Sequence, residues 1–248
     1  MLGNMVHLKN RLSHIWMLTG TGNHERFIDL TKIYELYGEL LTKSLIGFHA
    51  FTGCDFNPAF FNKGKKRPFT LLKKNVEFQK GFESLGNAEL TLDMLDNLFN
   101  VIQEFTCYMY NTKKTKDVDD SRFQLFVNSY KASDLNENFN KKVVNFDASS
   151  IPPCKAELYQ QFLRAHYISS IWKNAAQKHP TMLNPLEYGW EQQDTSYVFK
   201  WFEGDQLPCL VSDFIQDIPD DNEDDEKNDQ DDEHYDNSNA SDDEIDES

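Results

Sequence analysis

The stretch that decides how this chain folds is residues 49–72, HAFTGCDFNPAFFNKGKKRPFTLL. An apolar helix is expected to end in a turn at Gly53, because glycine adopts the positive φ that such turns need. The turn presents Asp55, and the basic loop 63–67 follows. Pro68 suits the first turn of a second helix, where its missing N–H costs no hydrogen bond. The stretch therefore predicts two helices joined by a segment that carries one carboxylate and a cluster of positive charges.

The residues before this stretch predict a β-hairpin followed by a helix. Residues 14–18 and 26–30 read as strands around the glycine-containing turn at 19–23. Thr31 is expected to cap a helix whose apolar residues recur at helical spacing as far as Phe48.

The residues after it predict further helices, one beginning at Thr91, a short one near 122–126 and a long one from about 155 to 177. A hairpin or strand pair is expected from residues 185–190 and 197–202. The fold class that we expect is therefore α/β and helix-rich.

The charge of the chain is concentrated in one segment. Of the 41 Asp and Glu among 248 residues, 18 lie in residues 213–248 beside a single Lys. The remaining 23 acidic and 24 basic residues leave residues 1–212 with a net charge of +1. Residues 213–248 are expected to be a disordered acidic tail, because they are too polar to bury a core. We expect a first region at 1–130, a polar linker at 131–150, and a helix with a short strand pair at 151–212.

Composition also bears on the compartment. The four cysteines form no CxxC pair, which indicates neither a disulfide framework nor a zinc site and fits a reducing environment. No apolar run reaches about 18 residues, so we expect no membrane contact. The N-terminal residues do not resemble a signal peptide. The expected location is intracellular, either cytoplasmic or nuclear.

Asp55 is the strongest candidate for a metal ligand. A carboxylate that follows a glycine turn at the end of a buried helix can hold Mg²⁺ or Mn²⁺. The alternative is that Asp55 caps the following turn, which Asp does often, and a single carboxylate does not make a magnesium site.

The basic loop is the candidate phosphate-binding site, formed by Lys63, Gly64, Lys65, Lys66 and Arg67. Lysine charge and the free N–H groups of a helix start together suit a phosphate. The alternatives are a solvated loop, or a docking place for the acidic tail.

Other residues with reactive side chains are assigned packing roles. Five dispersed histidines lack metal-ligand spacing, namely His14, His24, His49, His166 and His179. We expect His49 to be packed and hydrogen-bonded, and Cys54 to be a small buried residue without a catalytic partner. The four tryptophans Trp16, Trp172, Trp190 and Trp201 are expected in the core.

Residues 49–72 resemble an uncharacterised animal family whose members carry HAxTGCDxxSxFxGKGKxxxxxLL. The resemblance extends to residues 16–28, WMLTGTGNHERFI, which are similar to the family's LWxxTGTGNxxRFIxIH. Residues 151–167 resemble LPPxxxxLxxHxxRAxYQ, and residues 185–190 resemble PxxxGW. The resemblance covers about residues 14–205, and members often look like products of mobile elements.

That family is in turn similar to the PIN-like, flap-endonuclease-type nucleases. The resemblance implies a three-layer α/β domain with a central, largely parallel sheet and phosphodiester hydrolysis by Mg or Mn. It implies that Asp55 holds the metal and that the loop 63–67 holds the nucleic-acid backbone.

The departures from the family pattern indicate an incomplete site. Relatives carry an Asp-Thr-Asp strand end before the position of Trp16, whereas residues 1–13 contain no Asp or Glu, and Asn62 replaces a glycine. Two-metal hydrolysis needs several carboxylates around ions about 4 Å apart. The chain thus resembles the C-terminal half of a PIN-like domain, with an unpaired sheet edge and exposed apolar surface expected.

Three functions remain open. The first is a truncated, inactive PIN-like nuclease. The second is an interaction module whose acidic tail binds basic proteins. The third is an active nuclease with further carboxylates drawn from Asp29, Asp93, Asp96, Asp117, Asp119 or Asp120.

Overall fold

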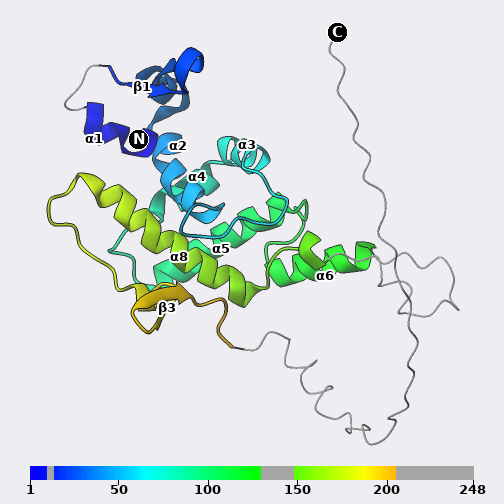
Figure 1. Cartoon of the computed structure of the whole chain (residues 1–248). Coiled ribbons are helices and arrows are strands. Elements are labelled where there is room, and N and C mark those ends of the chain that lie inside the picture. The colour runs from blue at the N-terminus through cyan, green and yellow to red at the C-terminus, as the bar shows by residue number, and fades with distance from the viewer. Residues whose placement is uncertain (10–13, 130–147, 205–248) are drawn as a thin grey trace, which may run out of the picture. The chain divides into compact units, whose positions relative to one another are not determined.

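A computed structural model describes residues 1–9, 14–129 and 148–204, all of which belong to one unit, Met1–Gln206 (Figure 1). The predicted linker 131–150 lies mostly outside the described residues, and the predicted acidic tail 213–248 lies wholly outside them.

The described part of the chain is mainly helical, as the sequence predicts. Its helices are α1 (Met5–Lys9), α2 (Leu30–Phe51), α3 (Lys66–Lys74), α4 (Val76–Ser84), α5 (Leu92–Met109), α6 (Val118–Ser129) and α8 (Lys155–Lys173). None of the helices in these segments is long and apolar enough to cross a lipid bilayer.

The sheets are small and antiparallel. Strand β1 (Trp16–Thr19) pairs with β2 (Arg26–Asp29), and β3 (Trp190–Gln193) pairs with β4 (Ser196–Phe199). The first predicted strand pair is therefore confirmed, and the second is present with a shifted first strand, because Pro185–Glu187 form a 3-10 turn and β3 begins at Trp190. No parallel strand pair occurs among the described residues, so the three-layer arrangement with a central parallel sheet is not confirmed.

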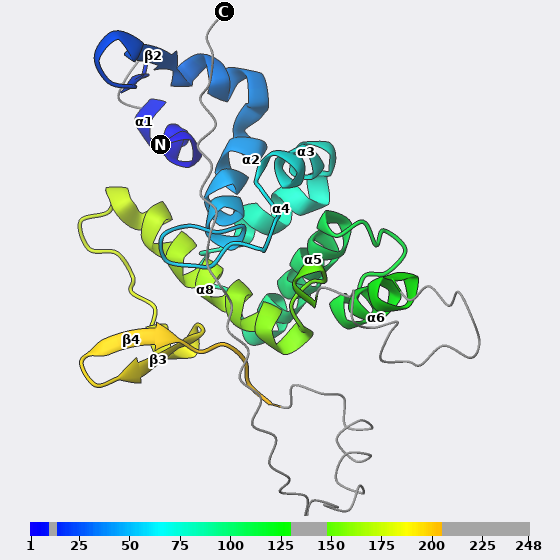
Figure 2. The ribbon, with the colours of Figure 1, turned by 45° about the vertical axis from the view of Figure 1, so that its right-hand side comes forward.

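Helix α2 is the central element, and it packs along both α4 and α8 (Figure 2). Phe48 lies edge-on to the rings of Phe82 and Phe105, with centroids 5.8 and 6.3 Å away. The approach to α4 is close at Gly47, where a Cβ atom would stand 2.3 Å from the carbonyl oxygen of Phe82. The second half of the predicted apolar face, with Leu41 and Phe48, thus forms the core, whereas Leu36 is 77% exposed and Gly38 interrupts the helical backbone with a φ of +78°.

The start of α2 corrects one expectation. Asp29 caps the helix, since its Oδ1 accepts a hydrogen bond from the backbone N–H of Lys32 at 2.9 Å. The hydroxyl of Thr31 instead accepts from the backbone N–H of Ile15, also at 2.9 Å. Thr31 therefore joins the hairpin to the helix, a role that depends on a residue 16 positions away.

Two of the four tryptophans are not core residues. Trp16 is 55% exposed and Trp201 is 51% exposed, whereas Trp172 and Trp190 pack against the main core. Trp16 belongs to the β1–β2 hairpin, which also exposes Leu18 and the cross-strand neighbour Phe27. The β1–β2 hairpin therefore carries exposed apolar side chains on its surface.

Candidate functional site

Asp55 lies at the tip of a tight turn that follows α2. The turn closes through two backbone hydrogen bonds, Cys54 N–H to Asn57 O at 2.9 Å and Asn57 N–H to Cys54 O at 3.3 Å. Gly53 has a φ of +112°, and a Cβ there would meet the Cα of Ala59 at 2.7 Å, so the turn requires glycine. Asp55 and Phe56 are consequently both exposed.

The described residues do not supply Asp55 with partners for a metal ion. No three His, Cys, Asp or Glu side chains gather closely enough to hold a metal within residues 1–9, 14–129 and 148–204. The donor set therefore does not fit the two-metal site that the resemblance implies.

The other carboxylates considered for such a site are placed elsewhere. Asp29 caps α2, and Asp96 accepts a hydrogen bond from the hydroxyl of Tyr159 at 3.3 Å. Asp117 pairs with the ammonium of Lys155 at 2.8 Å, and Asp119 accepts from the backbone N–H of the same lysine. Asp93 lies in the first turn of α5, and Asp120 lies in the first turn of α6.

Lys65 anchors the basic loop to the end of α2. Its ammonium lies 2.5 Å from His49 Nδ1, 2.5 Å from the carbonyl oxygen of Gly53 and 3.2 Å from that of His49. A lysine ammonium has three donors, and all three have partners here. Burial lowers the pKa of Lys65 below its ordinary value. We therefore remove Lys65 from the predicted phosphate-binding set.

Two other residues of the loop contact the end of α5. The ammonium of Lys63 lies 4.3 Å above the ring of Tyr110, and Arg67 donates a hydrogen bond to Oδ1 of Asn111. Within the described part of the chain this bond uses one of the five N–H donors of the Arg67 guanidinium. Gly64 is exposed, and nothing lies within 4 Å of the position of a Cβ there.

These contacts bring two basic segments together. Residues 56–76 contain six Lys and Arg, residues 105–116 contain three, and neither segment contains an acidic residue. Lys116 is paired with Glu104 at 3.2 Å. With Lys65 and Lys116 set aside, we call the remainder the basic face: Lys63, Lys66, Arg67, Lys73, Lys74, Lys113 and Lys114.

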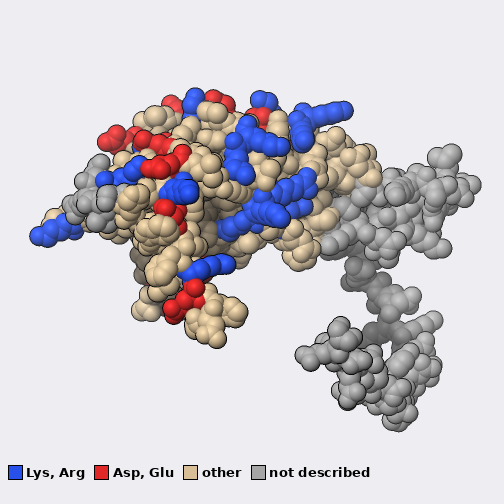
Figure 3. All heavy atoms as spheres, turned by 90° about the horizontal axis from the view of Figure 1, so that it is seen from above, with Lys and Arg blue, Asp and Glu red and all other residues tan. Residues whose placement is uncertain are grey.

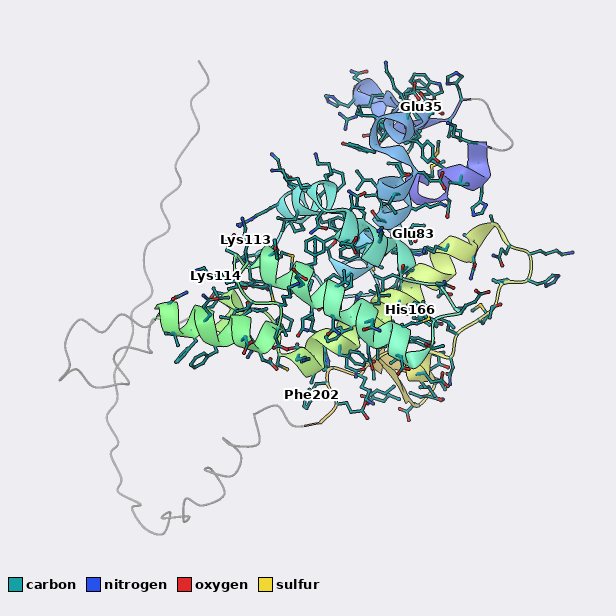
Figure 4. All side chains as sticks on the ribbon, turned by 180° about the vertical axis from the view of Figure 1, so that it is seen from behind. Glu35, Glu83, Lys113, Lys114, His166 and Phe202 are labelled. Carbon is teal, nitrogen blue, oxygen red and sulfur yellow. The ribbon has the colours of Figure 1, made fainter. Side chains whose placement is uncertain are left out.

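The pictures agree with this grouping. Lys and Arg side chains gather on one side of the surface seen from above, away from most of the acidic ones (Figure 3). Lys113 and Lys114 lie between α3 and α6 (Figure 4). All members of the basic face except the partly buried Lys63 are exposed. The sequence predicted the 63–67 half of this surface and missed the contribution of the turn after α5.

Sequence reasoning also missed Arg164, which is completely buried on α8. Its Nε donates to Oδ1 of Asn57 at 3.0 Å, and its Nη1 donates to the carbonyl oxygens of Gly189 and Lys200 at 3.2 and 2.6 Å. No ion pair among the described residues includes it. Within the described segments Nη2 is buried and has no hydrogen-bond partner, while the guanidinium lies 5.0 Å from the ring centroid of Phe199 and 5.7 Å from that of Trp201. Burial lowers the pKa of Arg164 to about 10, so it remains a cation at neutral pH.

A pocket of about 270 Å³ lies beside Arg164, between the start of α8 and the ends of α5 and β4. Its walls include the charged side chains of Arg122 and Glu157 and the aromatic rings of Phe61, Tyr110 and Trp201. Tyr110 also lies beneath Lys63, so the pocket adjoins the basic face.

The two histidines nearest the core have packing roles. His49 stacks on Trp172 with ring centroids 5.5 Å apart, and burial is the main reason that its pKa is lowered. His166 accepts a hydrogen bond from the N–H of Gly86 at Nδ1 and stacks on Tyr188. Neither histidine lies in the walls of the pocket beside Arg164.

Comparisons with protein-family models, curated proteins and solved structures found no match.

Proposed function

We propose that this protein binds nucleic acid through the phosphate backbone, using the basic face. The observation that carries the proposal is the attachment of the 63–67 loop to the end of α5, through Lys63 on Tyr110 and Arg67 on Asn111. This attachment joins two segments without acidic residues into one positive surface. Lysine and arginine contacts to phosphates supply most sequence-independent affinity for nucleic acid.

The net charge of −16 does not contradict such a surface. Most of the acidic excess belongs to residues 213–248, and residues 1–212 are close to neutral. Salt screens charges that are more than about 10 Å apart at 0.1 M ionic strength, so local charge decides contact affinity. The resemblance to PIN-like nucleases points to the same class of ligand.

Binding is proposed here, and hydrolysis is not. Asp55 is exposed, and the described residues provide no group of three metal ligands around it. Cleavage of an oligonucleotide that requires Mn²⁺ and is lost in Asp55→Ala would restore the nuclease as the leading function.

The test is the binding of a single-stranded oligonucleotide with two hydroxyl ends to the full chain, measured by fluorescence anisotropy. The variant Lys66→Glu/Lys113→Glu reverses one exposed charge in each half of the basic face. We expect it to weaken binding by at least about tenfold. Binding that is equally strong in this variant would contradict the proposal.

The matched control reverses two exposed lysines outside the basic face, Lys32→Glu/Lys178→Glu, and so changes the net charge equally. It is expected to lower affinity by less than about threefold, because its charges lie outside the contact surface. Equal losses in both variants would mean that net charge alone governs binding.

A further inference from the structure

The pocket beside Arg164 contains a buried cation that lies over two aromatic rings, 5.0 Å from the centroid of Phe199 and 5.7 Å from that of Trp201, but faces no paired carboxylate among the described residues. Arg164 has no exposed surface, it forms no ion pair among the described residues, and its Nη2 has no hydrogen-bond partner. A buried charge is ordinarily paired, and a buried donor is ordinarily hydrogen-bonded. Arg164 therefore points to an anion that this part of the structure does not itself provide.

The charges around the pocket favour an anion. The pocket walls contain two cationic side chains, Arg122 and Arg164, and one carboxylate, that of Glu157. Among the described residues Arg122 uses one donor, on the carbonyl oxygen of Pro152, and its guanidinium carries further N–H groups that suit an anion. Guanidinium groups match the geometry of phosphate oxygens and can bind them in pairs.

The aromatic side chains of the pocket favour a ligand that also carries a flat ring. Trp201 is 51% exposed and Phe61 is 55% exposed, although both line the pocket. Exposed aromatic faces of this kind stack on nucleobases. A pocket of about 270 Å³ is small, below the usual range for a drug-sized ligand, so it suits one terminal group and not a strand passing through.

The pocket also adjoins the basic face. Tyr110 has the ammonium of Lys63 4.3 Å from its ring centroid and contributes to the pocket wall. A strand that lies along the basic face can therefore place its end at the mouth of the pocket.

We propose that this pocket receives the phosphorylated end of a nucleic-acid strand, a phosphomonoester joined to a base. The phosphate contacts Arg122 on the side of the pocket next to the buried charge of Arg164, and the last base stacks on Trp201. Glu157 opposes the phosphate charge. The inference rests on the proposed function, because the basic face must hold the rest of the strand.

The experiment compares one single-stranded sequence with a 5′-phosphate, a 3′-phosphate or two hydroxyl ends, binding to the full chain in anisotropy titrations. We expect one phosphorylated form to bind about tenfold more tightly than the hydroxyl form. Equal binding of all three forms would contradict the proposed role of the pocket, but it would be compatible with nucleic-acid binding by the basic face. Failure of all three to bind would overturn the basic face and the pocket together.

Two variants test the pocket residues. Trp201→Ala should abolish the preference for the phosphorylated end, and Trp201→Phe should retain part of it, because a smaller ring still stacks. Glu157→Gln should increase the preference several-fold, a gain that a misfolded protein does not produce. Preferences unchanged in both Trp201→Ala and Glu157→Gln would place the phosphate elsewhere.

Glu89→Gln is the matched control for Glu157→Gln. Glu89 precedes α5, whereas Tyr110 follows it, so the 18 residues of the helix place Glu89 about 27 Å from the pocket end. The Glu89→Gln variant should prefer the phosphorylated strand over the hydroxyl strand to the same degree as the wild type. A free nucleoside monophosphate should displace the labelled phosphorylated strand only weakly. If it displaced that strand as well as an unlabelled strand does, the pocket would bind a free nucleotide, and the proposal of a strand end would be wrong.

Discussion

Arg164 donates its Nε–H to Oδ1 of Asn57, a residue 107 positions earlier in the chain, at 3.0 Å. Asn57 in turn donates through Nδ2 to the carbonyl oxygens of Ala50 and Gln161, at 3.0 and 3.2 Å. The pair therefore ties the turn that presents Asp55 to α8, and Arg164 extends the network to the β3–β4 hairpin through Gly189 and Lys200.

Replacing Arg164 should destabilise the fold. Arg164→Lys removes the planar set of donors and leaves Oδ1 of Asn57 and a carbonyl oxygen without partners in a buried place. We expect the free energy of unfolding to fall by roughly 2–4 kcal/mol, measured by urea denaturation. Arg26→Lys, at an exposed position of β2, should change it by less than about 0.5 kcal/mol. Equal effects at both positions would show that the Arg164 network contributes nothing.

Lys65 and Lys66 should affect different properties although they are neighbours. Lys65→Met removes three hydrogen bonds at the end of α2 and should lower the free energy of unfolding by about 1–2 kcal/mol. Lys66→Met removes only an exposed charge, so it should weaken oligonucleotide binding with little change in stability. Urea denaturation and anisotropy on both variants check this, and a reversed pattern would contradict the assignment of Lys65 as an anchor.

His166 should make stability depend on pH. Burial lowers the pKa of His166 from 6.5 to about 4 in the folded protein. Between these values the unfolded chain binds a proton that the folded chain does not, so stability falls as the pH drops from about 6.5 to about 4. The loss from this group reaches about 3 kcal/mol and is complete below the lower value.

The check is urea denaturation of the wild type and of His166→Asn at pH 7, 5 and 4. Asparagine keeps an acceptor near the position of Nδ1, which Gly86 N–H contacts, but cannot be protonated in this range. The variant should lose most of the dependence on pH, whereas His179→Asn, at an exposed position, should keep it. If the free energy of unfolding of His166→Asn depended on pH as strongly as that of the wild type, the dependence would arise from groups other than His166.

Gly47 should tolerate no side chain. In Gly47→Ala the new methyl group would stand 2.3 Å from the carbonyl oxygen of Phe82, so α2 and α4 must separate. The expected loss is about 2 kcal/mol or more in thermal or urea unfolding. Gly64→Ala is the control, since nothing lies within 4 Å of its Cβ position, and its stability should stay the same or rise slightly. A stable Gly47→Ala would mean that the two helices are not closely packed there.

Much of the fold could be predicted from local patterns. Apolar spacing located α2, α5 and α8, and α5 begins next to Thr91 as expected; the structure adds that the hydroxyl of Thr91 caps the helix by accepting from the N–H of Met94 at 3.4 Å. Turn residues located the first hairpin, and the second was found with its first strand placed too early in the chain. The prediction that Thr31 caps α2 was wrong. Asp29 and Thr31 are both good capping residues, and only the contact of Thr31 with Ile15 decides between them.

The site depends on contacts between distant segments, which local patterns do not show. The sequence grouped Lys63, Lys65, Lys66 and Arg67 by adjacency, whereas the fold turns Lys65 toward α2 and joins Arg67 to Asn111, 44 positions away. Arg164 gave no signal as a buried residue, because arginine is ordinarily exposed. The one available hint was its place in the resemblance at residues 151–167.

The most direct test of the basic face is the salt dependence of oligonucleotide binding by the full chain. Each phosphate contacted should contribute about −0.7 to the slope of log affinity against log salt for a single strand. Lys66→Ala/Lys113→Ala should therefore make the slope shallower by about 1.4, and Lys32→Ala/Lys178→Ala should leave it unchanged. A slope that is the same in the wild type and in Lys66→Ala/Lys113→Ala would contradict the account.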